Sequence, residues 1–304
     1  VDDPDANFYN VLTDLKTVFG PTVCPVIVPV IKDRQVVSYV NLIEMKCYKY
    51  DGNGNVSETD MPTAEISEKM EYRMEGLVAA FSEAVAETDD ALMEKFFEGE
   101  AFTQKELVKG LHDCMNRGLI TPVVCCSDVT MGCIDMLLKE VTLLMPSPAD
   151  CPPAEAVSGD DIEEISCTGD APLRAFVFKT VADQFVGKMS FIRVMSGVLK
   201  ANSEYINAST GGVEKIGKLY TLCGKKQTEV TSVGAGDICA AVKIGAATND
   251  TICEGKAVSL DKIVFPRPCY KMAVRPKSQG DESKISAAFA RLCEEDPILS
   301  FGQD

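Results

Sequence analysis

Residues 172–197, PLRAFVFKTVADQFVGKMSFIRVMSG, contain two runs of β-branched and aromatic residues, Leu173–Thr180 and Lys188–Met195, and end in a Ser-Gly turn signal. Short runs of the same kind follow, each separated from the next by glycine- or asparagine-containing turns. They are Glu204–Asn207, Val213–Leu222, Thr228–Val233 and Asp237–Ile244. Closely spaced short strands with almost no helical pattern predict a small β-barrel or sandwich over residues 172–264.

Residues 1–148 show a different pattern, in which helical and strand segments alternate. The expected helices run from Phe8 to Phe19, Met61 to Glu87, Thr103 to Gly118 and Ile134 to Leu144, and the expected strands are Val23–Val30, Val36–Tyr50 and Leu119–Cys126. Thr103 and Glu106 have the spacing of a capping box, which supports a helix start there. This alternation predicts an α/β unit with a parallel sheet over residues 1–148.

Two further segments complete the organisation. Residues 149–171 contain few large apolar residues and several Pro, Gly and Asp residues, so we expect a linker or a long surface loop. Residues 265–304 contain a strand pattern, Cys269–Arg275, followed by a helical pattern, Ser283–Leu292. One strand and one helix make only the beginning of a domain.

Charge is distributed unevenly along the chain, whose net charge is −16. Residues 1–171 carry 12 Lys and Arg against 32 Asp and Glu, whereas residues 172–264 carry 12 against 8. A split this sharp indicates separate modules. Only the second has a basic excess that favours a phosphate backbone as a partner.

The sequence contains no motif for self-sufficient catalysis. It has neither a Gly-x-x-x-x-Gly-Lys-Ser/Thr phosphate loop nor a Gly-x-Ser-x-Gly motif, and its one histidine, His112, lies in a polar helical stretch. The 13 cysteines show no Cys-x-x-Cys spacing. We therefore predict no catalytic residue and no metal site. The longest apolar runs are too short for a membrane helix, and the acidic start does not fit a signal peptide.

Three stretches resemble elongation factor G, the ribosomal translocation GTPase. The first comprises residues 79–100, 121–127 and 144–148; the second comprises residues 183–197 and 235–238; the third comprises residues 265–268, 284–288 and 294–297. The resemblance spans nearly the whole chain in the order found in the family. It implies a multidomain α/β plus β-barrel protein. Its parts are the C-terminal part of a P-loop GTPase α/β domain with an inserted subdomain, a translation-factor-type β-barrel and the start of an α+β domain III.

The resemblance also implies a guanine site at two positions. Asp2 matches the aspartate of the family's Asn-Lys-x-Asp motif, whose carboxylate accepts both N–H groups of the guanine edge. Ser127 matches the serine of the second guanine-contacting loop, although Asp128 stands where the family usually has Ala. The intact factor would bind GTP or GDP with Mg²⁺. Without a phosphate loop, we expect these 304 residues alone to bind no cofactor and to be inactive in hydrolysis.

In the family the barrel docks on small-subunit RNA of the ribosome. The candidate phosphate contacts are Lys188, Arg193, Lys215, Lys218, Lys225 and Lys226. The expected localisation is cytoplasmic, with no membrane or DNA partner. Two alternatives stay open: an elongation factor G-like paralogue or ribosome-protection protein, and a non-catalytic RNA-binding or scaffold module.

Overall fold

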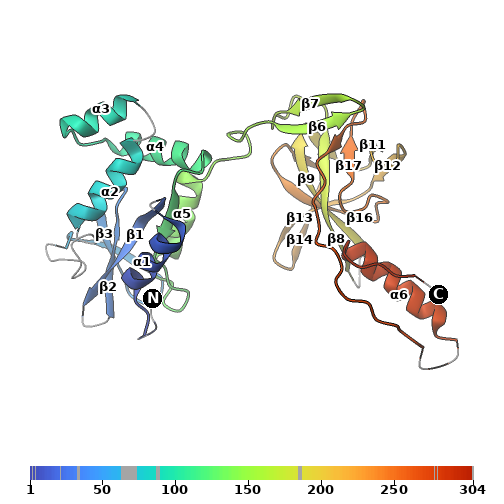
Figure 1. Ribbon diagram of the computed structural model, residues 1–304, viewed down its shortest axis with the longest axis horizontal. Helices are drawn as coiled ribbons and strands as arrows, with labels where there is room; N and C mark the ends of the chain where they lie inside the picture. Colours follow the sequence, from blue (N-terminus) through green and yellow to red (C-terminus); the bar gives the residue numbers. More distant parts are fainter. Residues whose placement is uncertain are drawn as a thin grey trace. The chain divides into compact units, whose positions relative to one another are not determined.

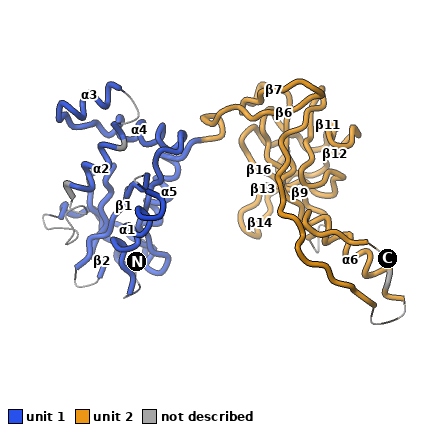
Figure 2. Tube along the Cα trace, viewed as in Figure 1, with its two compact units in different colours: residues 1–146 blue, residues 147–304 orange. Residues whose placement is uncertain are grey.

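The computed structural model describes residues 1, 3, 5–20, 22–32, 35–62, 74–86, 90–183, 187–276, 278 and 280–302. The chain divides into two compact units, Val1–Pro146 and Ser147–Asp304 (Figure 2). None of the described helices is long and apolar enough to cross a membrane.

Unit 1 is built on a mixed five-stranded sheet. The strands are β1 (Val23–Lys32), β2 (Gln35–Asn41), β3 (Lys46–Tyr50), β4 (Val56–Thr59) and β5 (Thr121–Val124), in the order β4-β3-β2-β1-β5. Only β1 and β5 are parallel, so the prediction of a parallel sheet was wrong for the other pairs. The expected strand Val36–Tyr50 folds back on itself. Asn41 Oδ1 accepts from the N–H groups of Ile43 and Glu44, and this turn creates the β2–β3 hairpin.

Five helices accompany this sheet: α1 (Phe8–Phe19), α2 (Met74–Ala86), α3 (Asp90–Glu98), α4 (Gln104–Asn116) and α5 (Ile134–Leu144) (Figure 1). The capping box of α4 is confirmed, because the Thr103 side chain accepts from the Glu106 N–H and Glu106 accepts from the Thr103 N–H. The first part of the helix expected over Met61–Glu87 lies outside the described residues. The core joins apolar side chains of the sheet and helices, including Leu12, Ile27 and Phe81.

Unit 2 contains an eight-stranded sheet in which every pair is antiparallel. Its strands are β8 (Arg174–Asp183), β9 (Gly187–Ser196), β11 (Ser203–Asn207), β12 (Val213–Ile216), β13 (Leu219–Cys223), β14 (Lys226–Val230), β16 (Ile238–Val242) and β17 (Thr251–Cys253), in the order β12-β11-β17-β8-β9-β16-β13-β14. A short ladder of β10 (Val198–Lys200) and β15 (Ser232–Gly234) accompanies it. The predicted combination of an α/β unit and a strand-rich module is confirmed.

The large sheet curls strongly. The N–H of Gly245, just after β16, donates to Glu214 Oε1 on edge strand β12 at 2.6 Å. The N–H of Asn202, just before β11, donates to the Gly217 carbonyl between β12 and β13 at 3.0 Å. The first contact brings edge strand β12 toward β16, near the other end of the order, whereas the second extends the β11–β12 ladder by one residue pair. Within the described residues the ladder still ends at β12 and β14, so full closure into a barrel stays a prediction.

Residues 149–171 are not the linker or loop that the sequence suggested. They contain a hairpin of β6 (Ala154–Ser158) and β7 (Asp161–Ile165), and β18 (Ser259–Leu260) pairs with β6. Ala156 and Ile165 are buried against Val258 and Leu260. The hairpin contributes few apolar side chains, and their partners Val258 and Leu260 come from a segment far along the chain. The composition of residues 149–171 alone therefore did not reveal the hairpin.

The last forty residues contain α6 (Glu282–Glu295), which confirms the expected helix. The strand expected at Cys269–Arg275 is absent from the described part of the chain, where these residues are all exposed and form no ladder. A β pattern needs a neighbouring strand to supply hydrogen bonds, and none of the described strands pairs with this segment.

Candidate nucleic-acid interface

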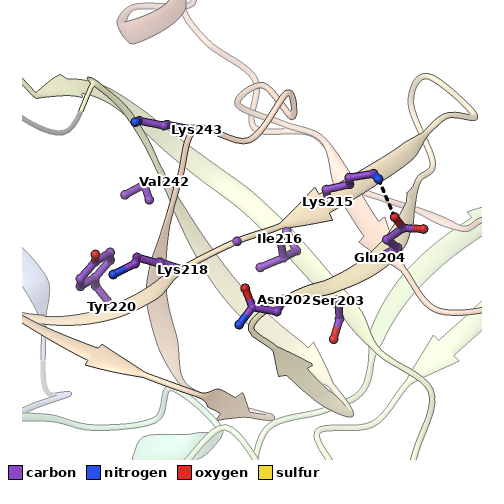
Figure 3. Close-up of a pocket in the computed structure, with 10 residues that line it drawn as sticks. Asn202, Ser203, Glu204, Lys215, Ile216, Lys218, Tyr220, Val242 and Lys243 are labelled. Atoms are coloured by element: carbon purple, nitrogen blue, oxygen red, sulfur yellow. Dashed lines mark ion pairs between the residues drawn. The ribbon is translucent and has the colours of Figure 1, made fainter.

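A groove of about 770 Å³ opens where the edge of the curled sheet approaches β13 and β16. It is lined by Asn202, Ser203, Glu204, Lys215, Ile216, Gly217, Lys218, Tyr220, Val242 and Lys243 (Figure 3). These residues come from the start of β11, the β12–β13 turn and the end of β16. A groove of this size falls within the range of about 300–1,000 Å³ that is typical of ligand sites.

Two backbone turns position the groove's polar residues. Asn202 and Lys243 both adopt left-handed backbone conformations, with φ of 55° and 58°. Asparagine tolerates this region better than most residues, whereas lysine is uncommon there. The Lys243 N–H donates to the Lys188 carbonyl at 2.9 Å, which fixes the turn that carries its side chain. The hydrogen bond from the Asn202 N–H to the Gly217 carbonyl continues the β11–β12 ladder and fixes this side of the groove.

Three lysines supply the positive charge of the groove. Lys215 forms an ion pair with Glu204 at 2.8 Å, and Lys218 forms one with Glu229 at 2.8 Å. Each hydrogen bond to a carboxylate raises the pKa of its lysine, so both ammonium groups stay charged at neutral pH. Lys243 has no carboxylate partner among the described residues. Because the two pairs are exposed and contribute little stability, an incoming phosphate can compete for the lysines.

The structure brings together only part of the predicted set of cations. Lys215 and Lys218 line the groove, whereas Lys225 and Lys226 lie in the β13–β14 hairpin turn. Lys188 is the second residue of β9, and its Nζ donates to the Gly245 carbonyl at 3.2 Å. Arg193 is exposed further along β9. The assignment of all six cations to RNA stays a prediction.

Sequence reasoning identified only Lys215 and Lys218 among the lining residues, and it missed the others, including Asn202, Tyr220 and Lys243. The one available signal was Lys243, a single cation that follows the apolar run of β16. Tyr220 reaches this place because it pairs with Ala240 across the β13–β16 ladder. That register is a tertiary property, which spacing along the chain does not reveal.

The two predicted guanine contacts fare differently. Asp2 lies outside the described residues. Ser127 is buried in the loop after β5, where its Oγ accepts from the Thr130 N–H at 3.1 Å and its own N–H donates to the Gly132 carbonyl at 2.9 Å. Within the described residues the Asp128 N–H has no hydrogen-bond partner, so it is a backbone donor that the loop can offer. No group of three His, Cys, Asp or Glu side chains in the described part could hold a metal ion.

A second cavity, of about 320 Å³, lies near the first residues of the chain. It is lined by Val1, Asp5, Ala6, Asn7, Phe8, Pro29, Ile31 and Val36. Ser127 does not line it, so the described residues do not unite the start of the chain and the Ser127 loop in one pocket.

Comparisons with known proteins agree with this arrangement. Residues 172–255 match the family model of elongation factor G domain 2, and residues 265–304 match that of elongation factor G domain III. A crystal structure of a protein from Thermus thermophilus is similar over 98% of this chain, with a TM-score of 0.79 and 29% sequence identity. The chain spans 42% of the length of that protein. Two successive stretches match two domains of one translation factor, and the chain therefore belongs to the elongation factor G family.

Proposed function

We propose that the chain is the docking part of a GTP-dependent translation elongation factor that drives ribosomal translocation. On this proposal unit 2 binds RNA of the small ribosomal subunit. The observation that carries it is the convergence of Lys215, Lys218 and Lys243 on one groove, within the stretch that matches elongation factor G domain 2. Lysines grouped around a concave surface favour a phosphate backbone over isolated anions.

The charge pattern of the molecule supports this assignment of roles. Residues 1–146 carry 12 Lys and Arg against 25 Asp and Glu, a net charge of −13, so unit 1 repels a nucleic acid. The module of residues 172–264, with a net charge of +4, is the part to which a polyanion is attracted. The exposed lysine–carboxylate pairs also keep the protein soluble, and they keep the net charge of the groove closer to zero until phosphate displaces the carboxylates.

For unit 1 we propose a share in binding the guanine of GTP or GDP, in a longer protein that also supplies the phosphate loop and Mg²⁺. The support is the Asp128 N–H, which is free to donate to a base carbonyl from a loop ordered by Ser127. Asp2 would add the carboxylate that selects guanine over adenine.

The alternatives are an elongation factor G-like paralogue or ribosome-protection protein, and a non-catalytic RNA-binding or scaffold module. Specific binding of GDP by a version of the protein that includes a phosphate loop, with rejection of ADP, separates the GTPase readings from the scaffold reading. A protein that binds ribosomal RNA and neither nucleotide supports the scaffold.

The docking proposal is tested by measuring affinity for isolated small ribosomal subunits over a range of salt concentrations. We expect binding that weakens steeply with salt. The combined variant Lys215→Ala, Lys218→Ala and Lys243→Ala should make the slope of log K against log salt shallower by about 2 to 3, since each lost phosphate contact removes roughly 0.7 to 0.9.

The matched control replaces three exposed lysines of the same unit that do not line the groove, Lys179, Lys256 and Lys262, with alanine. It changes net charge equally, so it should leave the slope closer to that of the wild type. No binding to small subunits at low salt would contradict the docking proposal. Equal effects of the two variants would show that the groove is not the site where the RNA binds.

A further inference from the structure

The floor of the groove is open at Gly217, which is exposed. A Cβ added to this residue would have no heavy atom within 4 Å, and its φ lies outside the left-handed region. Neither backbone conformation nor packing within the protein therefore requires glycine here. Glycine does, however, allow a ligand to approach the backbone closely.

An aromatic ring stands at one side of this floor. Tyr220 is half-buried on β13, lies beside Lys218 in Figure 3, and its side chain has no ring partner or hydrogen bond within the described part of the chain. A partly exposed tyrosine face next to lysines is the arrangement on which nucleic-acid bases stack in proteins that bind single strands.

A free amide lies at the same groove. The backbone N–H of Asn202 donates to the Gly217 carbonyl. The exposed side-chain amide of Asn202 has no hydrogen bond to any described residue. An amide offers both a donor and an acceptor, which suits the Watson–Crick edge of an unpaired base.

From these features we propose that the groove holds one unpaired nucleotide of an RNA loop or single strand. Its base stacks on Tyr220 above Gly217, Asn202 meets the base edge, and Lys215, Lys218 and Lys243 hold the adjacent phosphates. This inference rests on the proposed function and adds a specificity to it. Bases inside a duplex are already stacked and paired, so a duplex can use the lysines and cannot use Tyr220.

The test compares two labelled RNAs with equal numbers of phosphates, a hairpin with an eight-nucleotide loop and a blunt duplex, by fluorescence anisotropy with the full chain. Tyr220→Ala should weaken binding of the looped RNA about 5- to 150-fold, the loss expected for one stacked base. Binding of the duplex should stay unchanged. Tyr220→Phe should restore the affinity, because stacking needs the ring and not the hydroxyl.

Two further variants address the groove without removing the ring. Gly217→Leu should fill the floor and weaken loop binding alone, whereas Gly169→Leu, at another glycine with open space and an ordinary φ, should change nothing. Asn202→Gly keeps the left-handed turn and removes the amide, so it should alter preference among loop bases.

The possible outcomes distinguish this inference from the proposed function. If neither RNA binds at low salt, the docking proposal fails and the nucleotide site fails with it. If both RNAs bind and Tyr220→Ala weakens them equally or not at all, docking stands and the nucleotide site is wrong. Loss confined to the looped RNA supports both.

Discussion

The two most deeply buried charged side chains of the described residues lie one in each unit, and they differ in how well their partners replace water. Arg174 on β8 is 4% exposed, and Glu140 on α5 is 3% exposed. Arg174 donates to the carbonyls of Glu254 and Leu173 at 2.8 and 3.0 Å and forms an ion pair with Glu163 at 3.1 Å. These three acceptors replace much of the water around the guanidinium, and its Nε is left without a partner in the described structure.

Glu140 has far less support. One carboxylate oxygen accepts from Asn41 Nδ2 at 2.8 Å, and the other has no partner in the described structure. Burial raises the pKa of Glu140, the Asn41 hydrogen bond opposes that rise, and the nearby Glu44 carboxylate adds to it. The difference teaches that the number of partners, more than depth, decides how well a buried charged group is compensated for the loss of water.

The largest effect should come from breaking the supported site. Arg174→Met keeps much of the volume but leaves two carbonyls and the Glu163 carboxylate without their donor. We expect unit 2 to lose about 3 kcal/mol of unfolding free energy, measured by hydrogen exchange of β8 and β17 amides. Arg193→Met, an exposed arginine on the neighbouring strand β9, should change it by less than about 0.5 kcal/mol. Equal effects of the two variants would show that the Arg174 contacts contribute nothing.

A smaller loss is expected when only the charge of the partner is removed. Glu163→Gln retains an oxygen for Arg174, and because the Glu163 side chain is 36% exposed, solvent already screens the pair. We expect unit 2 to lose about 1 kcal/mol, from the same exchange measurement. The control is Glu164→Gln, at the exposed residue next to Glu163 on β7, which should leave the unfolding free energy of unit 2 unchanged. A loss as large as that of Arg174→Met would mean that the ion pair, and not the two carbonyls, holds the arginine.

The smallest effect, and the one that depends on pH, concerns Glu140→Gln. The folded pKa of Glu140 lies above its unfolded value, so the wild-type unit 1 loses stability as pH rises from about 4.5 through the raised pKa. Glutamine keeps the acceptor for Asn41 and has no charge to bury. The variant should match the wild type at low pH and exceed it in stability at pH 8, by hydrogen exchange of α5 amides. Glu98→Gln, on an exposed site, should show no such divergence. A variant less stable than the wild type at pH 8 would contradict a raised pKa.

Much of the fold could be predicted from local patterns. The α4 capping box, helices α5 and α6, and the β8 and β9 strands depend on residues close together in the chain, such as Thr103 and Glu106. The β6–β7 hairpin and the mixed pairing of unit 1 could not, because β6 is completed by β18 and the Val36–Tyr50 run is broken by the Asn41 turn.

The candidate site follows the same division. Lys218 directly follows Gly217 and Lys215 lies two residues before it, so one turn places both lysines at the groove. Lys243 and Tyr220 come from strands whose register sets their positions, and no local pattern specifies that register.

The pairing of β6 with β18 has a mechanical consequence. Val157 faces Ser259 and Ala156 faces Leu260 in an antiparallel ladder, so the chain arrives at β6 and leaves β18 at the same end of the pair. Tension applied between residues before Ala154 and after Leu260 therefore pulls the two strands apart from that end, one residue pair after another. Such unzipping loads a few hydrogen bonds at a time. Two further hydrogen bonds between Asn249 and Ile263 tie the segment after β18 to the turn before β17, and they share the load. The short β6–β18 pair, loaded in this direction, therefore offers little resistance to tension.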